Sequence, residues 1–313
     1  MTTHSNVRGR GVRLYGAAAA VLMTIGFFAT QAASGQDAGV SMSMQRSDAR
    51  VVYGEVVQVR GRVASRDAGR RVTLEYAGRG RGFGTVARTT TRAGGRYVLR
   101  VKPVRSGRLR VTVAEGASAA SSASRVRPVA VAARIASRRR VHMKRGRRAV
   151  LRGRVRPGFA GRTVRIQMKK AGSWRTVDRA RTRRQGRFAG SWEVTRGPGS
   201  YRTRVLFSGD RRNARRAEQS RVLVYRPGQA SYYGPGLYGN RTACGQTLTP
   251  GTVGVANRWL PCGTRVTFRY HGRTATVPVI DRGPFHGSRI WDLTYATKRK
   301  LGFGSTGVVW STR

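Results

Sequence analysis

The chain has 313 residues, enough for two or three domains, and it contains 63 Lys and Arg residues against 12 Asp and Glu. A net charge of +51 predicts binding to polyanions, so nucleic acid and anionic cell-wall polymers are both candidate partners. No segment after the N-terminal one is apolar enough to span a membrane, which excludes proteins that cross a membrane several times.

The N-terminal segment has the pattern of an export signal. Arg8, Arg10 and Arg13 precede the apolar run LYGAAAAVLMTIGFFA, which leads into the small residues of TQAASGQ. This order is typical of a cleaved signal peptide, here residues 1–33, and an uncleaved membrane anchor is the alternative. We expect a secreted, cell-wall-associated protein with no membrane span after cleavage. This location disfavours nucleic acid as the partner.

Residues 39–227 contain an internal repeat. The segment VRGRVASRDAGRRVTLEY at 59–76 aligns without a gap with LRGRVRPGFAGRTVRIQM at 151–168, and three shorter pairs follow in the same order. Short alternating strands separated by Gly-rich turns predict two tandem β-sandwiches, at 39–131 and 133–227. These units resemble bacterial immunoglobulin-like modules. The Ser- and Ala-rich stretch at 117–124 is predicted to be a flexible loop or a weak linker.

Arginine alternates with Val, Leu and Ile in most of these predicted strands. In a strand this alternation places the apolar residues in the core and the arginines on the solvent face. One interpretation is simply a solvated, charged surface. The other is an adhesive surface, on which arginines hold phosphate-bearing wall polymers through paired hydrogen bonds.

The C-terminal segment, 229–313, has a different composition, rich in Gly, Thr, Pro and aromatic residues. Strands are predicted at 264–270, 274–281, 288–294 and 306–311, and His271 and Gly272 form a tight turn between the first two. A short helix is predicted at 294–302, with Thr294 as N-cap and Gly302 as its C-terminal stop. Short strands with one small helix predict a compact barrel.

Cys244 and Cys262 are the two cysteines of the chain. In an exported protein an even pair predicts a disulfide, and two unpaired buried thiols are the alternative. His271 and His286 offer too few further ligands for a metal site, so we expect no metal and no other cofactor.

Five short motifs in this segment appear in a fixed order: ASYYG, RTACGQ, LPCGTRV, VIDRGPF and RIWDLT. In sequence and spacing they resemble the double-psi β-barrel domain of the rare lipoprotein A family. That family includes lytic transglycosylases acting on peptidoglycan, and its fold is similar to that of expansins and barwins. The resemblance covers about the last 85 residues. It implies a six-stranded double-psi β-barrel in that segment. Together with the two sandwiches predicted from the repeat, it leads us to expect an all-β chain.

The resemblance also implies roles for single residues. The catalytic Asp of the family falls on Asp281, and a second Asp of the family falls on Asp292. We predict both as catalytic, and for Asp292 the alternative is a buried Asp that only forms hydrogen bonds. A Glu that active members carry is replaced here by Gln246, and a His that the family often carries is replaced by Asn257. One acid of the usual pair is therefore an amide in this chain.

The remaining chemistry allows two functions. Lytic cleavage can proceed with few acids because a hydroxyl of the sugar itself attacks, so Asp281 is predicted to act as acid and base. The positive charge of Arg282 favours the ionised form of Asp281 and opposes this role. The alternative is a non-catalytic, expansin-like module that binds peptidoglycan, because Gln246 cannot donate an acidic proton.

Substrate contacts are expected along the barrel groove, with peptidoglycan glycan strands as the partner. We assign them to Tyr233, Gln246, Asn257, Arg282 and Phe285. Tyr232, Trp259 and Trp291 are further aromatic residues that can stack on sugar rings, although core packing is the simpler role for each. Asp281 also has a simpler role, which is to hold a turn by accepting backbone N–H groups. A secreted polyanion binder with a merely structural barrel is the third hypothesis, and it leaves the motifs unexplained.

Overall fold

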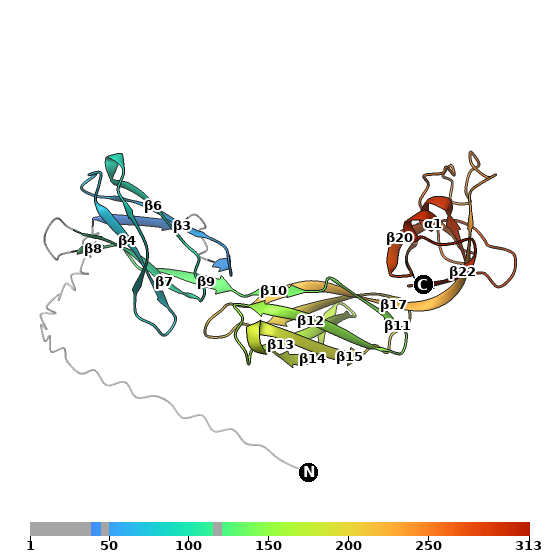
Figure 1. Cartoon of the computed structure of the whole chain (residues 1–313), viewed down its shortest axis with the longest axis horizontal. Helices are drawn as coiled ribbons and strands as arrows, with labels where there is room; N and C mark the ends of the chain where they lie inside the picture. Colours follow the sequence, from blue (N-terminus) through green and yellow to red (C-terminus); the bar gives the residue numbers. More distant parts are fainter. Residues whose placement is uncertain (1–38, 45–49, 115–120) are drawn as a thin grey trace, which may run out of the picture. The chain divides into compact units, whose positions relative to one another are not determined.

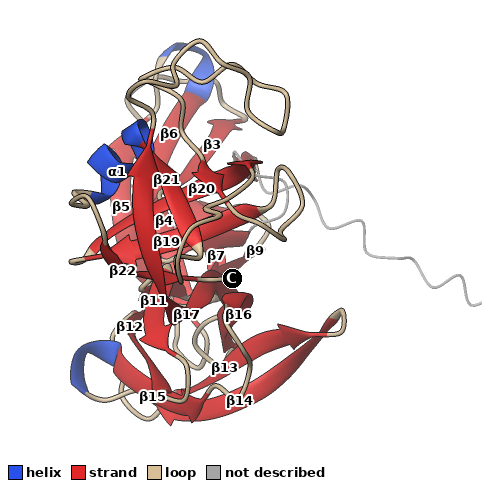
Figure 2. Cartoon of the chain, turned by 90° about the vertical axis from the view of Figure 1, so that its right-hand side faces the viewer, coloured by secondary structure: helices blue, strands red, loops and turns tan. Residues whose placement is uncertain are grey.

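The computed structural model describes residues 39–44, 50–114 and 121–313. The predicted signal peptide and residues 117–120 of the predicted loop lie outside these ranges. Strands dominate the described chain, and its one α-helix is α1, Tyr295–Leu301 (Figure 2). Within the same ranges, no helix has the length and apolar character needed to cross a membrane. The prediction of an all-β chain is confirmed.

Two sheets enclose the first hydrophobic core. One has the order β1–β3–β6, and the other has the order β2–β9–β7–β4–β5 with β8 paired to β7. Val59, Leu74 and Leu109, which come from both sheets, are fully buried between them. The bounds are β1 Val40–Met44, β2 Arg50–Val52, β3 Val57–Val63, β4 Arg71–Gly78, β5 Gly84–Thr90, β6 Arg96–Val101, β7 Gly107–Ala114, β8 Ser121–Ala123 and β9 Arg127–Ala132.

A second pair of sheets encloses the next core. The order is β10–β12–β15 in one, and β14–β13–β16–β17 with β11 on β17 in the other. Leu151, Ile166 and Val205 are fully buried between them. The bounds are β10 Arg134–Ser137, β11 Arg140–Lys144, β12 Arg148–Arg156, β13 Thr163–Lys170, β14 Ser173–Arg181, β15 Arg187–Glu193, β16 Gly199–Phe207 and β17 Arg216–Tyr233. We call the two units the first and the second sandwich.

The repeated segments adopt matching elements. β3 corresponds to β12, and β4 corresponds to β13. In each sandwich one short 3-10 helix leads into the next matching strand, Ala93–Gly95 before β6 and Arg184–Gly186 before β15. Arg96 and Arg100 of β6 are exposed while Tyr97 and Leu99 between them are buried, as the alternation predicts. The immunoglobulin-like assignment and the domain limits 39–131, 133–227 and 229–313 stay predictions, although each core takes its residues from one of these ranges.

The C-terminal strands close into a barrel. Their order is β17–β21–β18–β20–β19–β22, and β22 pairs again with β17, so that the ring has six strands. Trp291, Phe268 and Val277 are fully buried inside it. Figure 1 shows this ring, with α1 beside it, in orange and red. The new bounds are β18 Val255–Ala256, β19 Arg265–Tyr270, β20 Arg273–Asp281, β21 Trp291–Thr294 and β22 Gly307–Ser311.

The helix ends and the tight turn that the sequence predicts in this segment are confirmed, and one predicted strand is shorter than expected. Thr294 caps α1 by accepting the N–H of Thr297 at 3.3 Å, and Gly302 ends the helix with a φ of 63°. His271 and Gly272 both have positive φ in the turn between β19 and β20. The strand predicted at 288–294 begins only at Trp291, because the chain turns at Gly287, whose φ is 65°.

A one-residue bulge in β20 sets the register of the barrel. Val255 lies opposite Val279, whereas the next residue of β18, Ala256, lies opposite Asp281. The extra residue is Ile280, which is 1% exposed. Its side chain occupies the space beside Gly254, where a Cβ atom would lie 2.4 Å from Ile280 Cδ1. Bulges of this kind change the direction of the side chains that follow them.

We expect the change Gly254→Ala to destabilise the barrel by about 1–3 kcal/mol, because the added methyl group overlaps Ile280 in a filled interior. The measurement is urea denaturation of the full chain, following the transition that shifts when the Cys244–Cys262 disulfide is reduced. Gly251→Ala is the matched control, since its nearest heavy atom is 4.0 Å from the new Cβ. Equal midpoints for the two variants would contradict the proposed packing of the bulge.

Candidate active site

Four neighbouring strands place a row of residues on the outer face of the barrel. Ser231 of β17 lies opposite Asp292 of β21, Asp292 lies opposite Ala256 of β18, and Ala256 lies opposite Asp281 of β20. Val255 and Leu293, the neighbours of Ala256 and Asp292 in the chain, are buried in the core. Because side chains alternate between faces, the row points away from that core. The two acids predicted as catalytic therefore flank a single small residue.

Backbone groups fix the orientation of the Asp281 carboxylate. Its Oδ1 atom accepts the N–H of Ala243 at 2.9 Å and the N–H of Arg282 at 2.9 Å. The side chain thus holds a turn, as its simpler role predicts. Both bonds end on Oδ1, so among the described residues no backbone N–H occupies Oδ2. A carboxylate held in this way keeps one oxygen available for chemistry.

Asp292 lies in a less polar environment. Its Oδ1 atom accepts the hydroxyl of Ser231 at 2.9 Å. Burial raises the pKa of the Asp292 carboxyl above its ordinary value of 3.8. The hydrogen bond from Ser231 and the positive charge of Arg289 lower this pKa in part, and the negative charge of Asp281 raises it further. Asp292 is therefore a carboxyl group that keeps its proton to a higher pH than it would in water.

Tyr233 lies beside both acids. It follows Ser231 by two positions in β17, so the two side chains share the outer face. Burial raises the pKa of the Tyr233 hydroxyl far above its usual range, and the charges of Asp281 and Asp292 raise it further. The hydroxyl is buried without a well-aligned hydrogen-bond partner among the described residues. The hydroxyl therefore keeps its proton over the ordinary pH range, and it lies close enough to both acids for their charges to act on it.

A disulfide holds the loop that contacts Asp281. Cys244 and Cys262 are bonded, with 5.8 Å between their Cα atoms, which confirms the predicted pairing. The N–H of Cys244 donates to the carbonyl of Ile280, and the N–H of Gly263 donates to the carbonyl of Val279. Both ends of the disulfide are thus attached to the bulged end of β20. A cross-link over 18 residues contributes about 3 kcal/mol in the chain-entropy model.

Two residues predicted to contact substrate form hydrogen bonds with backbone groups, and their contact with substrate stays a prediction. Asn257 is 2% exposed, and its amide donates to the carbonyl of Ile290 and accepts the N–H groups of Trp259 and Leu260. The Arg282 guanidinium donates to the carbonyl of Leu260 at 3.2 Å and to further groups of the same loop. In this structure both side chains fix the loop that carries Trp259.

Two large aromatic side chains stand out from the loops next to Asp281. Trp259 and Phe285 are each 70% exposed. Arg258 joins their loops, because its guanidinium donates to the carbonyls of Pro284 and Gly287. The sequence favours Phe285 for stacking and leaves Trp259 open between stacking and core packing. The exposure of Trp259 depends on the loop path set by Asn257. Trp291, in contrast, is fully buried in the core.

The remaining predicted residues lie at the surface. Gln246 is exposed, on the loop that contributes Ala243, and its backbone carbonyl accepts the N–H of Thr242. His271 and His286 are exposed as well. Among the described residues, no group of three or more His, Cys, Asp and Glu side chains is arranged to hold a metal ion.

Comparison with known proteins identifies the barrel. The family model described as "Lytic transglycolase" matches residues 226–310, which include the whole acid row. This segment is similar to the double-psi β-barrel domain of the rare lipoprotein A family. The predicted resemblance is therefore confirmed for the C-terminal part of the chain, and the rare lipoprotein A-like barrel is the name we use for it below.

Curated relatives agree with this assignment over the same length. The rare lipoprotein A-like barrel is 45% identical over 83 residues to the probable endolytic peptidoglycan transglycosylase RlpA of Synechocystis, covering 26% of each chain. It is 40% identical over 82 residues to the endolytic peptidoglycan transglycosylase RlpA of Neisseria meningitidis, covering 26% of this chain and 34% of the relative. For the probable enzyme of Aquifex aeolicus the identity is 39% over 87 residues, covering 27% and 38%.

The chain thus spans between about a quarter and two fifths of the length of these relatives. The shared part is the barrel, so the activity, substrates and partners of the whole protein are matters of proposal.

The raised pKa of Asp292 predicts a pH-dependent stability difference. A carboxyl group whose pKa is higher in the folded state stabilises the fold at low pH, and this contribution is lost as pH rises through the folded-state pKa. We expect Asp292→Asn to gain stability relative to the natural protein as pH rises from about 4 to about 8. The measurement is the unfolding temperature of the barrel in both proteins, taken from the transition that shifts when the Cys244–Cys262 disulfide is reduced.

Ser231→Ala is the companion variant in this series. It removes the hydrogen bond that lowers the Asp292 pKa, so the pH window in which stability falls should move upward. A difference between Asp292→Asn and the natural protein that stays constant across the whole range would show that Asp292 does not titrate as described.

Proposed function

We propose that the barrel binds glycan strands of peptidoglycan across its acid row and cleaves them by lytic transglycosylation. The observation that carries the proposal is the register that sets Asp281 and Asp292 on either side of Ala256, beside the exposed Trp259 and Phe285. The names of the relatives support it, because each is called a peptidoglycan transglycosylase.

The reaction needs one proton donor and one proton acceptor. The oxygen of a sugar hydroxyl attacks the anomeric carbon and forms the new carbon–oxygen bond of an anhydro ring. The glycosidic bond breaks, its oxygen takes a proton from an acid, and the attacking hydroxyl gives its proton to a base. No water enters the products, which distinguishes this reaction from hydrolysis.

Asp292 and Asp281 fit these two tasks. Asp292 is the proton donor in our scheme, because burial raises its pKa and keeps the proton available. Asp281 is the acceptor, because two backbone N–H groups bind Oδ1 and leave Oδ2 for the sugar hydroxyl. The Tyr233 hydroxyl lies beside both and stabilises whichever carboxyl group is charged. This scheme divides between two residues the role that the sequence assigns to Asp281 alone.

Substrate binding is assigned to the rim of the acid row. Trp259 and Phe285 present large apolar faces on which sugar rings stack. Gln246, exposed on the neighbouring loop, contributes hydrogen bonds to sugar hydroxyl groups. Asn257 and Arg282 are assigned a positioning role, since their side chains hold the Trp259 loop by its backbone.

A non-catalytic binding module is the second candidate function. It is favoured by Gln246, an amide at the position where the resemblance implies a Glu in active members. In that case the acid row and the aromatic pair hold a glycan strand without cleaving it. Either function places the protein outside the cytoplasm, which agrees with the predicted signal peptide and with the Cys244–Cys262 disulfide.

Cleavage is tested with the purified full chain and peptidoglycan sacculi, by mass spectrometry of soluble products. We expect anhydro-muropeptides, and their rate of release should fall about 100-fold or more in Asp281→Asn and in Asp292→Asn. Asp67→Asn, a change in the first sandwich, is the control. Full activity of Asp292→Asn would assign both proton transfers to Asp281, and the absence of products from the natural protein would leave only the binding function.

Binding is tested separately by co-sedimentation with sacculi. Replacing Trp259 or Phe285 by Ala should weaken binding about 10-fold each, because each change removes a stacking surface worth about 1.4 kcal/mol. Val308→Ala removes a 44% exposed apolar side chain of β22, outside both loops, and should leave binding unchanged. Equal affinities for all three variants would refute the proposed groove.

A further inference from the structure

Both sandwiches place arginines face to face at the same point of the fold. In the first sandwich Arg62 of β3 lies directly opposite Arg96 of β6. In the second sandwich Arg154 of β12 lies directly opposite Arg187 of β15. Residues paired in this way point to the same side of the sheet, with about 5 Å between their Cα atoms.

A matching turn adds a third arginine to each pair. The N–H of Arg92 donates to the carbonyl of Arg96 at 2.8 Å, and the N–H of Arg183 donates to the carbonyl of Arg187 at 2.7 Å. We call Arg62, Arg96 and Arg92 the first arginine row, and Arg154, Arg187 and Arg183 the second.

A glycine fixes each of these turns against the neighbouring strand. A Cβ atom at Gly95 would lie 2.7 Å from the carbonyl oxygen of Val63, and one at Gly186 would lie 2.0 Å from that of Val155. Both glycines also have positive φ. The two rows are therefore held by the backbone in the same way.

The rows are electrostatically unfavourable by themselves. Like charges directly opposite each other destabilise a sheet. Among the described residues, the six guanidinium groups have no ion-pair or side-chain hydrogen-bond partner. Some arginines elsewhere in the sandwiches are paired with acid, as in Arg110–Glu75 at 2.6 Å and Arg162–Asp210 at 3.0 Å. Arginines also face each other outside the rows, as Arg165 and Arg179 do, but there the Arg165 guanidinium donates to the hydroxyl of Ser208. The unfavourable arrangement recurs in both units, which indicates that an external anion compensates it.

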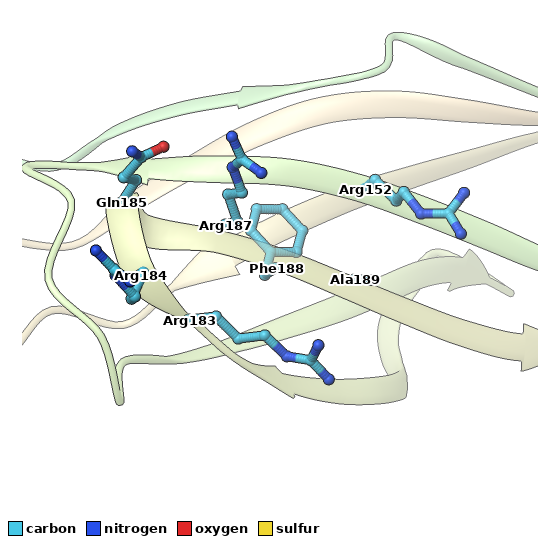
Figure 3. Close-up of a pocket in the computed structure, with 7 residues that line it drawn as sticks. All are labelled: Arg152, Arg183, Arg184, Gln185, Arg187, Phe188 and Ala189. Atoms are coloured by element: carbon cyan, nitrogen blue, oxygen red, sulfur yellow. The ribbon is translucent and has the colours of Figure 1, made fainter.

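A depression with the form of a binding site adjoins two members of the second row, Arg183 and Arg187, whereas Arg154 does not line it. This open depression of about 940 Å³ is lined by Arg152, Arg183, Arg184 and Arg187 together with Gln185, Phe188 and Ala189. Figure 3 shows these side chains arranged around Phe188, on β12, on β15 and on the turn that leads into β15. No carboxylate lines this depression. Its chemistry is that of a receptor for anions.

We propose that the arginine rows bind the phosphate groups of a phosphodiester-linked cell-wall polymer. The guanidinium fork matches two phosphate oxygens at once, and two forks on adjacent strands can hold one phosphate from both sides. A polymer offers many phosphates, so two rows on one chain increase its apparent affinity. The choice of a wall polymer over nucleic acid rests on the proposed function, which places the chain at the wall.

The test uses the full chain and immobilised poly(glycerol phosphate) as the probe. The row variant changes Arg62, Arg96, Arg154 and Arg187 to Gln. The matched control changes four exposed arginines outside the rows, Arg79, Arg81, Arg175 and Arg181, to Gln, so that both proteins lose the same charge. We expect the dissociation constant to rise about 10-fold or more in the row variant and about 2-fold in the control.

Stability separates binding from a structural role. Removing the opposed charges should leave the unfolding temperature of the row variant unchanged or higher. A second variant covers the case in which the first does not fold. It carries one change in each row, Arg96→Gln and Arg187→Gln. It should show a smaller loss of binding in the same direction.

Two outcomes would overturn the proposal. Equal losses in the row variant and the control would mean that net charge alone determines binding. Tighter, row-dependent binding to single-stranded DNA of similar length would assign the rows to nucleic acid instead. Because the probe contains no peptidoglycan, a failure of the sacculus experiments would leave this measurement unaffected, so the two proposals fail separately.

Discussion

The acid row on the outer face of the barrel depends on one extra residue in β20. With Ile280 as the extra residue, buried beside Gly254, Asp281 becomes the partner of Ala256 and enters the row that already contains Asp292. Without this bulge the register would bring Ile280 to the position opposite Ala256 and would turn Asp281 to the other face, since side chains alternate along a strand. The packing of one isoleucine thus decides whether the barrel has one exposed acid or two neighbouring acids.

The loops around this row are held by few but specific contacts. The disulfide, the Asn257 amide and the Arg258 and Arg282 guanidinium groups all bind backbone near Asp281. Side chains that look like substrate contacts in the sequence are therefore used to position the exposed aromatics. A rigid loop reduces the conformational entropy lost when a glycan binds, which favours affinity.

Charge has different uses in the two parts of the chain. In the second sandwich, Arg162 is buried and forms an ion pair with Asp210, so its charge is compensated within the fold. Five of the six arginines in the rows are exposed and Arg154 is partly buried. None of the six is paired with an acid among the described residues, which makes the rows suited to a ligand that carries phosphate. In the barrel, Asp281 and Asp292 are the only Asp or Glu residues of the segment 229–313. Burial is the main cause of the raised pKa of Tyr233, and the charges of these two acids raise it further.

Much of this protein was readable from its sequence. The all-β class, the internal repeat, the cap at Thr294, the turn at His271 and the Cys244–Cys262 pair all follow from patterns within a few residues, or from a pair with no alternative partner. The tertiary structure alone decided that Trp259 is exposed, that Asn257 and Arg282 bind backbone, and that arginines oppose each other in register. These features depend on contacts between segments distant in the chain, and local propensity does not encode which strand residues become neighbours.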